Sequence, residues 1–354
     1  MGMVLYMNKK ARLKDIADKL GISVSSVHRA MMKPSLVSDD LKGRIHTVAE
    51  ELGYEVNLVA SSLSSKKILR FVLMCGNNLF FQQVITGARS AERELQIYGV
   101  TVDVIYGKNN NYIEQLKQLN ELAEDTVYDG IVLAPTHSQL LNPVIAKITE
   151  KGIPVVSFVH DIPGSARRFY VGENPKITGE TAAFLYDNAL PEGSVVAVMG
   201  SYVDTHGLNE RLRCFKEYLD LTGKLAVTNS FQYFDSVEGA YEMCTQVLAN
   251  IKPAAIFSNT MLGTIGCARA IQDMKLKGEI FMVGFDVNDE IAGYLNDGTL
   301  FASLQHAPFM QGSMAVKALF GLAKGTFKEL GDCHYINTNV VFKTNVEEFI
   351  IPVL

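Results

Sequence analysis

The sequence lacks the features of a membrane or secreted protein. No apolar run among its 354 residues approaches the roughly 20 residues that are needed to span a bilayer. Residues 1–10 contain neither the apolar stretch nor the small-residue cleavage site of a secretory signal. We therefore expect a cytoplasmic protein whose thiols stay reduced.

Motifs that carry chemistry are missing as well. The five cysteines are isolated, and none forms the C-x-x-C pair of a zinc or redox site, so we expect them to be packing residues. The histidines lack metal-ligand spacing, and no serine-hydrolase elbow, phosphate-binding loop, zinc-protease motif or dinucleotide-binding motif occurs. The sequence therefore predicts no catalytic residue, no metal and no cofactor. An enzyme with an unrecognised active site remains an alternative.

A strong net charge is also absent, because the formal total is only −5. The charges are nevertheless unevenly distributed. Residues 1–70 contain 12 Lys and Arg but seven Asp and Glu, whereas the remaining residues carry a net charge of −10. A basic segment joined to an acidic body is typical of a polyanion-binding module attached to a second function.

Apolar spacing in the basic segment predicts three short helices. The apolar residues of 13–20 recur at the spacing of one helix face. Gly21 suits a tight turn, and Ser23 can cap a second helix over residues 24–32. Ser38 can cap a third helix with an apolar stripe between residues 41 and 52. This order is the outline of a helix-turn-helix, with a three-helix bundle that does not bind DNA as the alternative.

The second helix of a helix-turn-helix enters the major groove with its N-terminal residues at the base edges. The polar residues on the outward side of this helix are Ser25, Ser26, His28 and Arg29. Arg29 could donate two hydrogen bonds to guanine or could bind only phosphate. Lys14, like the basic residues at positions 9, 10 and 12, is expected to contact phosphate, which positions the protein without reading the sequence.

This segment resembles the DNA-binding head of the lactose/galactose repressor family. The resemblance rests on the stretch 13–30, on Val37-Ser38 with Arg44-Ile45, and on the stretch 51–63. In that family the last stretch becomes a hinge helix when the dimer meets its operator, and a leucine wedges into the minor groove. The resemblance implies that Leu63 is this leucine and that Asn57 and Ala60 also contact DNA, although Leu63 could instead be a packing residue of a linker. His28 stands where the family usually has Ser, so it could change the base preference or touch only phosphate.

After about residue 70, short β-rich runs alternate with helical ones. The predicted strands lie at 71–75, 100–105, 130–134, 154–159, 195–199, 226–231, 254–258, 281–285 and 301–304. Helical stretches between them include 83–96, 112–124, 143–151, 178–188, 209–221, 237–250 and 262–274. Continuous apolar strands between helices predict parallel sheets that are covered on both faces, and the number of strands predicts two doubly wound lobes.

We therefore predict an α/β protein with three parts. Residues 1–56 form a helix-turn-helix DNA-binding domain, residues 57–69 a hinge helix and linker, and residues 70–354 an effector-binding and dimerisation domain. Within this last domain, the N-terminal lobe spans about 70–172 and 305–330, and the C-terminal lobe spans about 173–304 and 331–354.

Ligands of such sheets bind beyond the carboxyl ends of the strands. The residues that follow the predicted strands are rich in amides, carboxylates, imidazoles and aromatic rings, but poor in any one charge. Such a set suits a neutral polyhydroxylated ligand, because aromatic faces cover a sugar ring and polar groups pair with its hydroxyls. The candidates are Phe80, Phe81, His160, Asp161, Asn209, Arg211, Asn259, Asp286 and Gln305.

These strand ends resemble the periplasmic sugar-binding-protein fold that forms the family's effector domain. The points of match include Asn78-Leu79-Phe80-Phe81, Asp129-Gly130-Ile131, Ile153-Pro154, Asp161 with Pro163, Tyr170 to Asn174, Ser258-Asn259, Gly284-Phe285-Asp286 and Gln305. The resemblance favours a monosaccharide-sized ligand. It implies that Phe81, Asn259, Asp286 and Gln305 are the stronger candidates for ligand contact.

Other interpretations of several residues remain open. Thr260 stands where the family has an acidic residue. Arg211 could be an ion-pair residue that braces a lobe, and Phe80 could be a core residue. Asp286 could cap a helix, and His306 could be a plain surface histidine.

The sequence thus predicts a transcriptional regulator, most often a repressor in this family, that binds a palindromic operator as a homodimer. A monosaccharide or polyol between its lobes would control its affinity for double-stranded DNA. Association with the nucleoid would follow, and no membrane partner is expected. A cytosolic sugar-binding protein is the alternative. The identity of the effector, whether it releases or holds DNA, the operator sequence, and dimer against tetramer all stay open.

Overall fold

The computed structural model describes residues 11–32, 37–52, 54, 68–107, 111–137, 139–201, 204–327 and 331–350. Contacts divide the chain into two compact units. We use "head" for residues 11–54 and "body" for residues 69–350, and each is described by itself.

The described head residues form the three helices α1 (Leu13–Leu20), α2 (Val24–Met32) and α3 (Asp39–Glu51). Ile16, Val27 and Ile45, one from each helix, are fully buried between them. Gly21 ends α1 with a positive φ of 65°. The Ser23 hydroxyl then accepts a hydrogen bond from an amide in the first turn of α2 at 3.1 Å. The predicted helix-turn-helix outline is confirmed.

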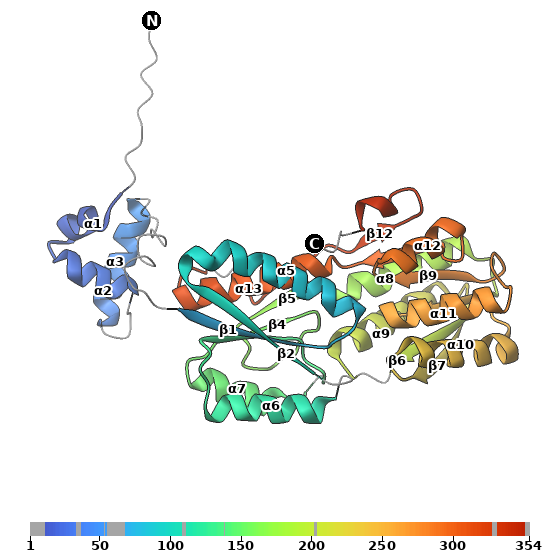
Figure 1. Cartoon of the computed structure of the whole chain (residues 1–354). Helices are drawn as coiled ribbons and strands as arrows, with labels where there is room; N and C mark the ends of the chain where they lie inside the picture. Colours follow the sequence, from blue (N-terminus) through green and yellow to red (C-terminus); the bar gives the residue numbers. More distant parts are fainter. Residues whose placement is uncertain are drawn as a thin grey trace, which may run out of the picture. The chain divides into compact units, whose positions relative to one another are not determined.

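The body contains two six-stranded sheets, and each forms the centre of one lobe (Figure 1). The N-lobe strands are β1 (Leu69–Cys75), β2 (Val100–Tyr106), β3 (Gly130–Leu133), β4 (Val155–Phe158), β5 (Phe169–Glu173) and β11 (Cys333–Ile336), in the order β11-β5-β4-β3-β1-β2. The C-lobe strands are β6 (Val195–Ser201), β7 (Ala226–Tyr233), β8 (Ala255–Ser258), β9 (Phe281–Phe285), β10 (Ala302–Gln305) and β12 (Asn339–Val341), in the order β12-β10-β9-β8-β6-β7. Neighbouring strands run parallel, apart from the antiparallel pair β10 and β12.

Helices cover both faces of each sheet (Figure 1). In the N-lobe, α5 (Leu79–Leu95) and α13 (Pro308–Lys324) lie on one face, and α6 (Tyr112–Glu124) and α7 (Asn142–Glu150) lie on the other. In the C-lobe, α8 (Pro175–Ala189) and α9 (His206–Thr222) face α10 (Val237–Ile251), α11 (Met261–Asp273) and α12 (Asp289–Asp297) across the sheet. Short 3-10 turns occur at Gln96–Tyr98 (η2) and Val346–Glu348 (η3). The predicted α/β class with two doubly wound lobes is confirmed.

Strand β11 changes the predicted division between the lobes. The sequence predicts residues 331–354 for the C-terminal lobe, but β11 pairs with β5 in the N-lobe sheet. The chain therefore passes between the lobes after β5, after β10 and after β11. These crossings place Glu173 and His306 where the two lobes join.

Polar caps fix where helices begin after the strands. The Asn78 side chain caps α5, accepting a hydrogen bond from an amide at 3.2 Å. The Thr260 hydroxyl caps α11 in the same way at 3.0 Å, and Asn288 caps α12 at 2.8 Å. Each cap satisfies a backbone amide that has no partner within the helix, and so favours a helix start at that residue.

The described ranges contain neither a membrane-spanning helix nor a cluster of metal ligands. No helix there is long and apolar enough to cross a membrane. Over the same residues, no group of His, Cys, Asp and Glu side chains is placed to hold a metal ion.

Candidate functional site

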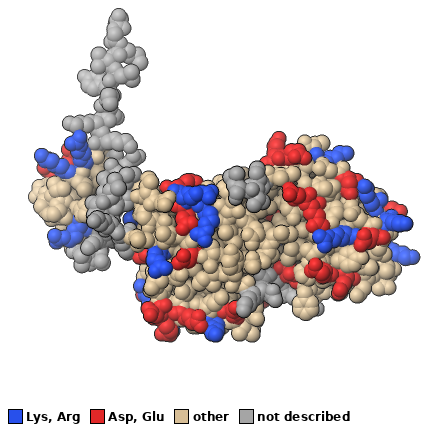
Figure 2. Space-filling model, viewed as in Figure 1, with Lys and Arg blue, Asp and Glu red and all other residues tan. Residues whose placement is uncertain are grey.

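Helix α2 carries four of the eight residues that are predicted to contact DNA, and Lys14 lies on α1. Lys14, Ser25, His28 and Arg29 are exposed, and Ser26 is half-buried. Val27 and Ala30, on the opposite side of α2, are buried in the head core. Figure 2 shows Lys and Arg side chains at the surface of the head. The predicted contacts Asn57, Ala60 and Leu63 lie outside the described residues.

A cavity with about 770 Å³ of empty space, partly open to solvent, lies between the two lobes of the body. Its lining comes from the carboxyl ends of β1, β3, β4 and β5 in the N-lobe and of β7, β8, β9 and β10 in the C-lobe. Helices α5, α9, α11 and α13 complete it. The carboxyl ends of the parallel strands therefore meet at this cavity.

Many of the predicted ligand residues line this cavity. They are Phe80, Phe81, His160, Arg211, Asn259 and Asp286. Phe80 also packs against the C-lobe core. The φ angles of Asp286 and the lining residue Val159 are 61° and 64°, values that non-glycine residues rarely adopt and that concentrate at functional sites. The alternative that Asp286 caps a helix is wrong, because Asn288 caps α12.

Three predicted ligand residues do not line the cavity, and each has another polar partner: Asp161, Asn209 and Gln305. The Asp161 carboxylate accepts hydrogen bonds from Arg167, including one at 2.7 Å. Asn209 is exposed and donates a hydrogen bond to Asp204 at 2.6 Å. The Gln305 side chain is buried, and its amide nitrogen lies 3.5 Å from a backbone oxygen just after η3.

Glu173, the last residue of β5, forms a buried ion pair with Arg211 on α9. Their side chains are only 2% and 6% exposed. The Arg211 guanidinium also donates a hydrogen bond to the backbone carbonyl of Asn259, and its central carbon lies 4.5 Å from the centroid of the Phe285 ring. Arg211 thus makes the ion pair that the sequence left open, and it lines the cavity as well.

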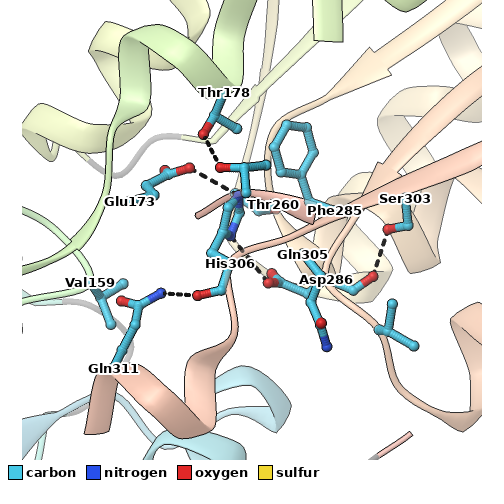
Figure 3. Close-up of polar contacts among 12 residues, drawn as sticks. Val159, Glu173, Thr178, Thr260, Phe285, Asp286, Ser303, Gln305, His306 and Gln311 are labelled. Carbon is cyan, nitrogen blue, oxygen red and sulfur yellow. Dashed lines mark hydrogen bonds and ion pairs between the residues drawn. The ribbon is translucent and has the colours of Figure 1, made fainter. Parts of the chain in front are cut away.

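His306 lies directly after β10, between two carboxylates (Figure 3). Its Nε2 atom is 2.9 Å from Glu173 Oε2, and its Nδ1 atom is 3.3 Å from Asp286 Oδ1. The alternative of a surface histidine is wrong, because the side chain is 4% exposed. Burial disfavours the charged form, but the facing carboxylates of Glu173 and Asp286 raise the pKa of His306 to about 9. His306 is therefore positively charged at neutral pH.

Two neighbours of His306, the imidazole of His160 and the carboxylate of Glu173, have lowered pKa values. Burial, reinforced by the Arg211 cation, lowers the pKa of His160 to about 3, so this imidazole is neutral. Burial alone would raise the pKa of Glu173, but Arg211 and His306 outweigh burial and hold that pKa below its usual range. The cluster therefore contains two cations, Arg211 and His306, which are paired with the carboxylates of Glu173 and Asp286.

Several polar residues that line the cavity were not among the predicted site residues. They are Asn78, Thr136, Glu173, Thr205, Asp235, Thr260, His306 and Gln311. Asn78, Thr260 and His306 follow strands, so their positions were a usable signal. Glu173 ends a strand that the sequence pattern did not reveal, and Gln311 reaches the cavity from α13.

Comparison with known proteins gives two family matches. Residues 71–327 match the periplasmic binding protein domain family. Residues 12–57 match the family of bacterial regulatory proteins described as the lacI family.

Individual relatives are similar over most of the chain. The HTH-type transcriptional regulator RegA of Clostridium saccharobutylicum is 24% identical over 336 residues, which cover 92% of this chain and 95% of RegA. The HTH-type transcriptional repressor PurR of Vibrio campbellii is 25% identical over 301 residues, 81% of this chain and 84% of PurR. Among solved structures, GanP, a glucose-galactose binding protein from Geobacillus stearothermophilus, is 26% identical with a TM-score of 0.72, over 79% of this chain and 99% of GanP.

Proposed function

We propose that this chain is a DNA-binding transcriptional regulator controlled by a small carbohydrate. The chain belongs to the lacI family of bacterial regulatory proteins, and its body belongs to the periplasmic binding protein domain family. The observation that carries this proposal is the presence of two different modules in one chain. A helix-turn-helix with an exposed polar helix is joined to a body whose cavity is lined by aromatic rings, amides and paired charges. The combination of these two modules favours a regulator over an enzyme or a sugar-binding protein without a DNA role.

The effector in this proposal is a monosaccharide or polyol held between the lobes. The rings of Phe80 and Phe81, with centroids 5.3 Å apart at an angle of 82°, offer apolar surface to a sugar ring. Asn259 and Asp286, from two neighbouring strand ends, supply oxygen atoms that can accept hydrogen bonds from hydroxyls. The glucose-galactose binding activity named for GanP supports the same ligand class.

Coupling to DNA follows from the position of the cavity. A ligand that touches both lobes binds better to the arrangement of the lobes in which both can reach it. This difference in affinity increases the population of molecules in that arrangement. We propose that the shift is transmitted through residues 57–69 to the heads of a homodimer, which acts as a repressor at a palindromic operator. Two identical heads on a two-fold axis require repeated half-sites. Such a regulator would act in the cytoplasm, associated with the nucleoid.

DNA selection tests this proposal directly. The full-length chain is incubated with random duplex DNA, and the bound fraction is sequenced over several rounds. We expect an enriched inverted repeat, whose affinity falls steeply as salt rises because several phosphates lose their counterions on binding. Enrichment of no sequence together with a flat salt response would contradict the proposed DNA-binding function.

A further inference from the structure

The charge of each of the two cations in the inter-lobe cavity is balanced by a carboxylate of the chain, although the buried Nε–H of Arg211 has no hydrogen-bond partner among the described residues. Arg211 is held by the Glu173 carboxylate, by the carbonyl of Asn259 and by the face of the Phe285 ring. His306 is held between Glu173 at 2.9 Å and Asp286 at 3.3 Å. His160 also lines the cavity, but it is neutral because burial and Arg211 hold its pKa at about 3.

The polar atoms that remain for a ligand are mostly acceptors. The Asn259 side chain donates its N–H to the Leu208 carbonyl, and the Gln311 side chain donates its N–H to the His306 carbonyl at 2.9 Å. Within the described part of the chain, the opposite oxygen atoms, Asn259 Oδ1 and Gln311 Oε1, are buried without a hydrogen-bond partner. Both residues line the cavity, so both oxygens can accept hydrogen bonds from a ligand.

We propose that Glu173 makes this cavity selective for uncharged, hydroxyl-bearing sugars and against their acidic counterparts. This inference rests on the proposed carbohydrate function. Glu173 balances both Arg211 and His306, so an incoming carboxylate or phosphate finds no unpaired cation and instead meets the carboxylates of Glu173, Asp286 and Asp235. Burying an unpaired charge is costly, whereas a neutral sugar donates hydroxyl hydrogens to the free oxygens of Asn259 and Gln311. Discrimination against the acid of about 100-fold or more is expected from such a site.

Matched sugars test the proposal on the full chain. The probes are galactose with galacturonate, glucose with glucuronate and glucose 6-phosphate, and ribose with ribose 5-phosphate, each titrated by calorimetry and by thermal shift. We expect at least one neutral member to bind and its acidic counterpart to bind about 100-fold more weakly. An acidic member that binds as tightly as its neutral partner would overturn the selectivity and leave the proposed regulator intact. If no sugar of either kind binds, the carbohydrate part of the proposed function fails, and this inference fails with it.

The role of Glu173 is tested by Glu173→Gln. This variant removes the carboxylate partner of Arg211 and leaves His306 with Asp286 alone, so we expect the preference for the neutral sugar to shrink at least tenfold. Glu150→Gln, an exposed charge change at the end of α7, is the matched control and should keep the wild-type preference. A folded Glu173→Gln variant with undiminished discrimination would overturn the assignment. If that variant does not fold, the matched neutral and acidic sugars titrated into the wild-type chain decide whether the cavity selects uncharged sugars. Glu173→Asp keeps the carboxylate charge, so this second variant is expected to retain the discrimination.

Discussion

At the scale of single residues, the buried charge of His306 has a direct consequence for stability. Its folded-state pKa of about 9 lies above the ordinary value of 6.5. The charged imidazole therefore stabilises the fold in full below pH 6.5, and this contribution is lost as the pH rises through 9. We expect the free energy of unfolding to fall by about 3 kcal/mol over this window from His306 alone. Urea unfolding at a series of pH values measures this decrease.

Two variants isolate this contribution. His306→Gln keeps a hydrogen-bonding side chain but cannot be protonated, so the part of the pH slope that comes from His306 should vanish. His334→Gln, at an exposed position of β11, should keep the full slope. His160 does not contribute in this window, because its pKa is lowered in the folded protein and it is neutral in both states above 6.5. Identical slopes in wild type and His306→Gln would show that His306 is not charged in the fold.

The exposed basic residues of the head are expected to differ in what they contribute to DNA binding. Arg29 is exposed on α2, whose side chains face the bases in a helix-turn-helix, whereas Lys14 is exposed on α1. Arg29→Ala should therefore relax the preference at one operator position by about 1–3 kcal/mol, while Lys14→Ala should weaken all sequences alike and reduce the salt slope. Binding to a panel of single-base operator variants separates the two effects. Uniform weakening by Arg29→Ala would mean that Arg29 touches only phosphate.

At the scale of elements, the packing of α5 against α13 depends on glycine. A Cβ atom on Gly312 would lie 2.0 Å from the Val84 carbonyl oxygen, and one on Gly87 would lie 1.9 Å from the Phe309 carbonyl oxygen. Gly312→Ala must push the two helices apart, so we expect a loss of about 1–3 kcal/mol of stability. Gly293→Ala, on the exposed side of α12 with nothing within 4 Å, should be neutral or stabilising by up to about 1 kcal/mol. Thermal unfolding of both variants checks this contrast, and equal melting temperatures would contradict it.

Elements with a strong local pattern could be predicted from the sequence, and elements defined by distant pairing could not. The amphipathic spacing of residues 112–124 predicts the bounds of α6. Strand β5 ends in Gly172 and Glu173, so its apolar run is too short to stand out. Strands β11 and β12 are short edge strands in which most side chains are partly or fully exposed. Their place in the sheets depends on partners far away in the sequence. Ser38 directly precedes α3, but its side chain makes no capping hydrogen bond, so the predicted side-chain cap is wrong.

The strand-end rule explains both the correct and the incorrect site predictions. It brings His160, Asn259 and Asp286 to one cavity because the carboxyl ends of parallel strands converge. The rule cannot tell which strand-end side chain already has a local partner, and Asp161 is held by Arg167 in the following loop. The sequence did not reveal the Glu173–Arg211 pair either, because its two residues are 38 positions apart and meet only through the fold.

At the scale of the whole molecule, the charge asymmetry of the sequence corresponds to two separate units. The basic head matches a family of DNA-binding regulators, so the global net charge of −5 hides the DNA partner. In the acidic body, the chain crosses between the lobes beside Glu173 and His306, which also line the cavity. A ligand in that cavity therefore lies against the segments about which the two lobes would move.

The central claim is that a sugar in this cavity controls the affinity of the head for DNA. The measurement is the operator Kd of the full chain, by fluorescence anisotropy, with and without a saturating concentration of a sugar that binds. We expect the sugar to change the Kd at least about fivefold in the wild type and in Asn209→Ala, whose side chain lies outside the cavity, but not in Asp286→Ala, which should bind DNA normally without sugar. An operator Kd that is the same with and without bound sugar, or an undiminished response of Asp286→Ala, would contradict the account.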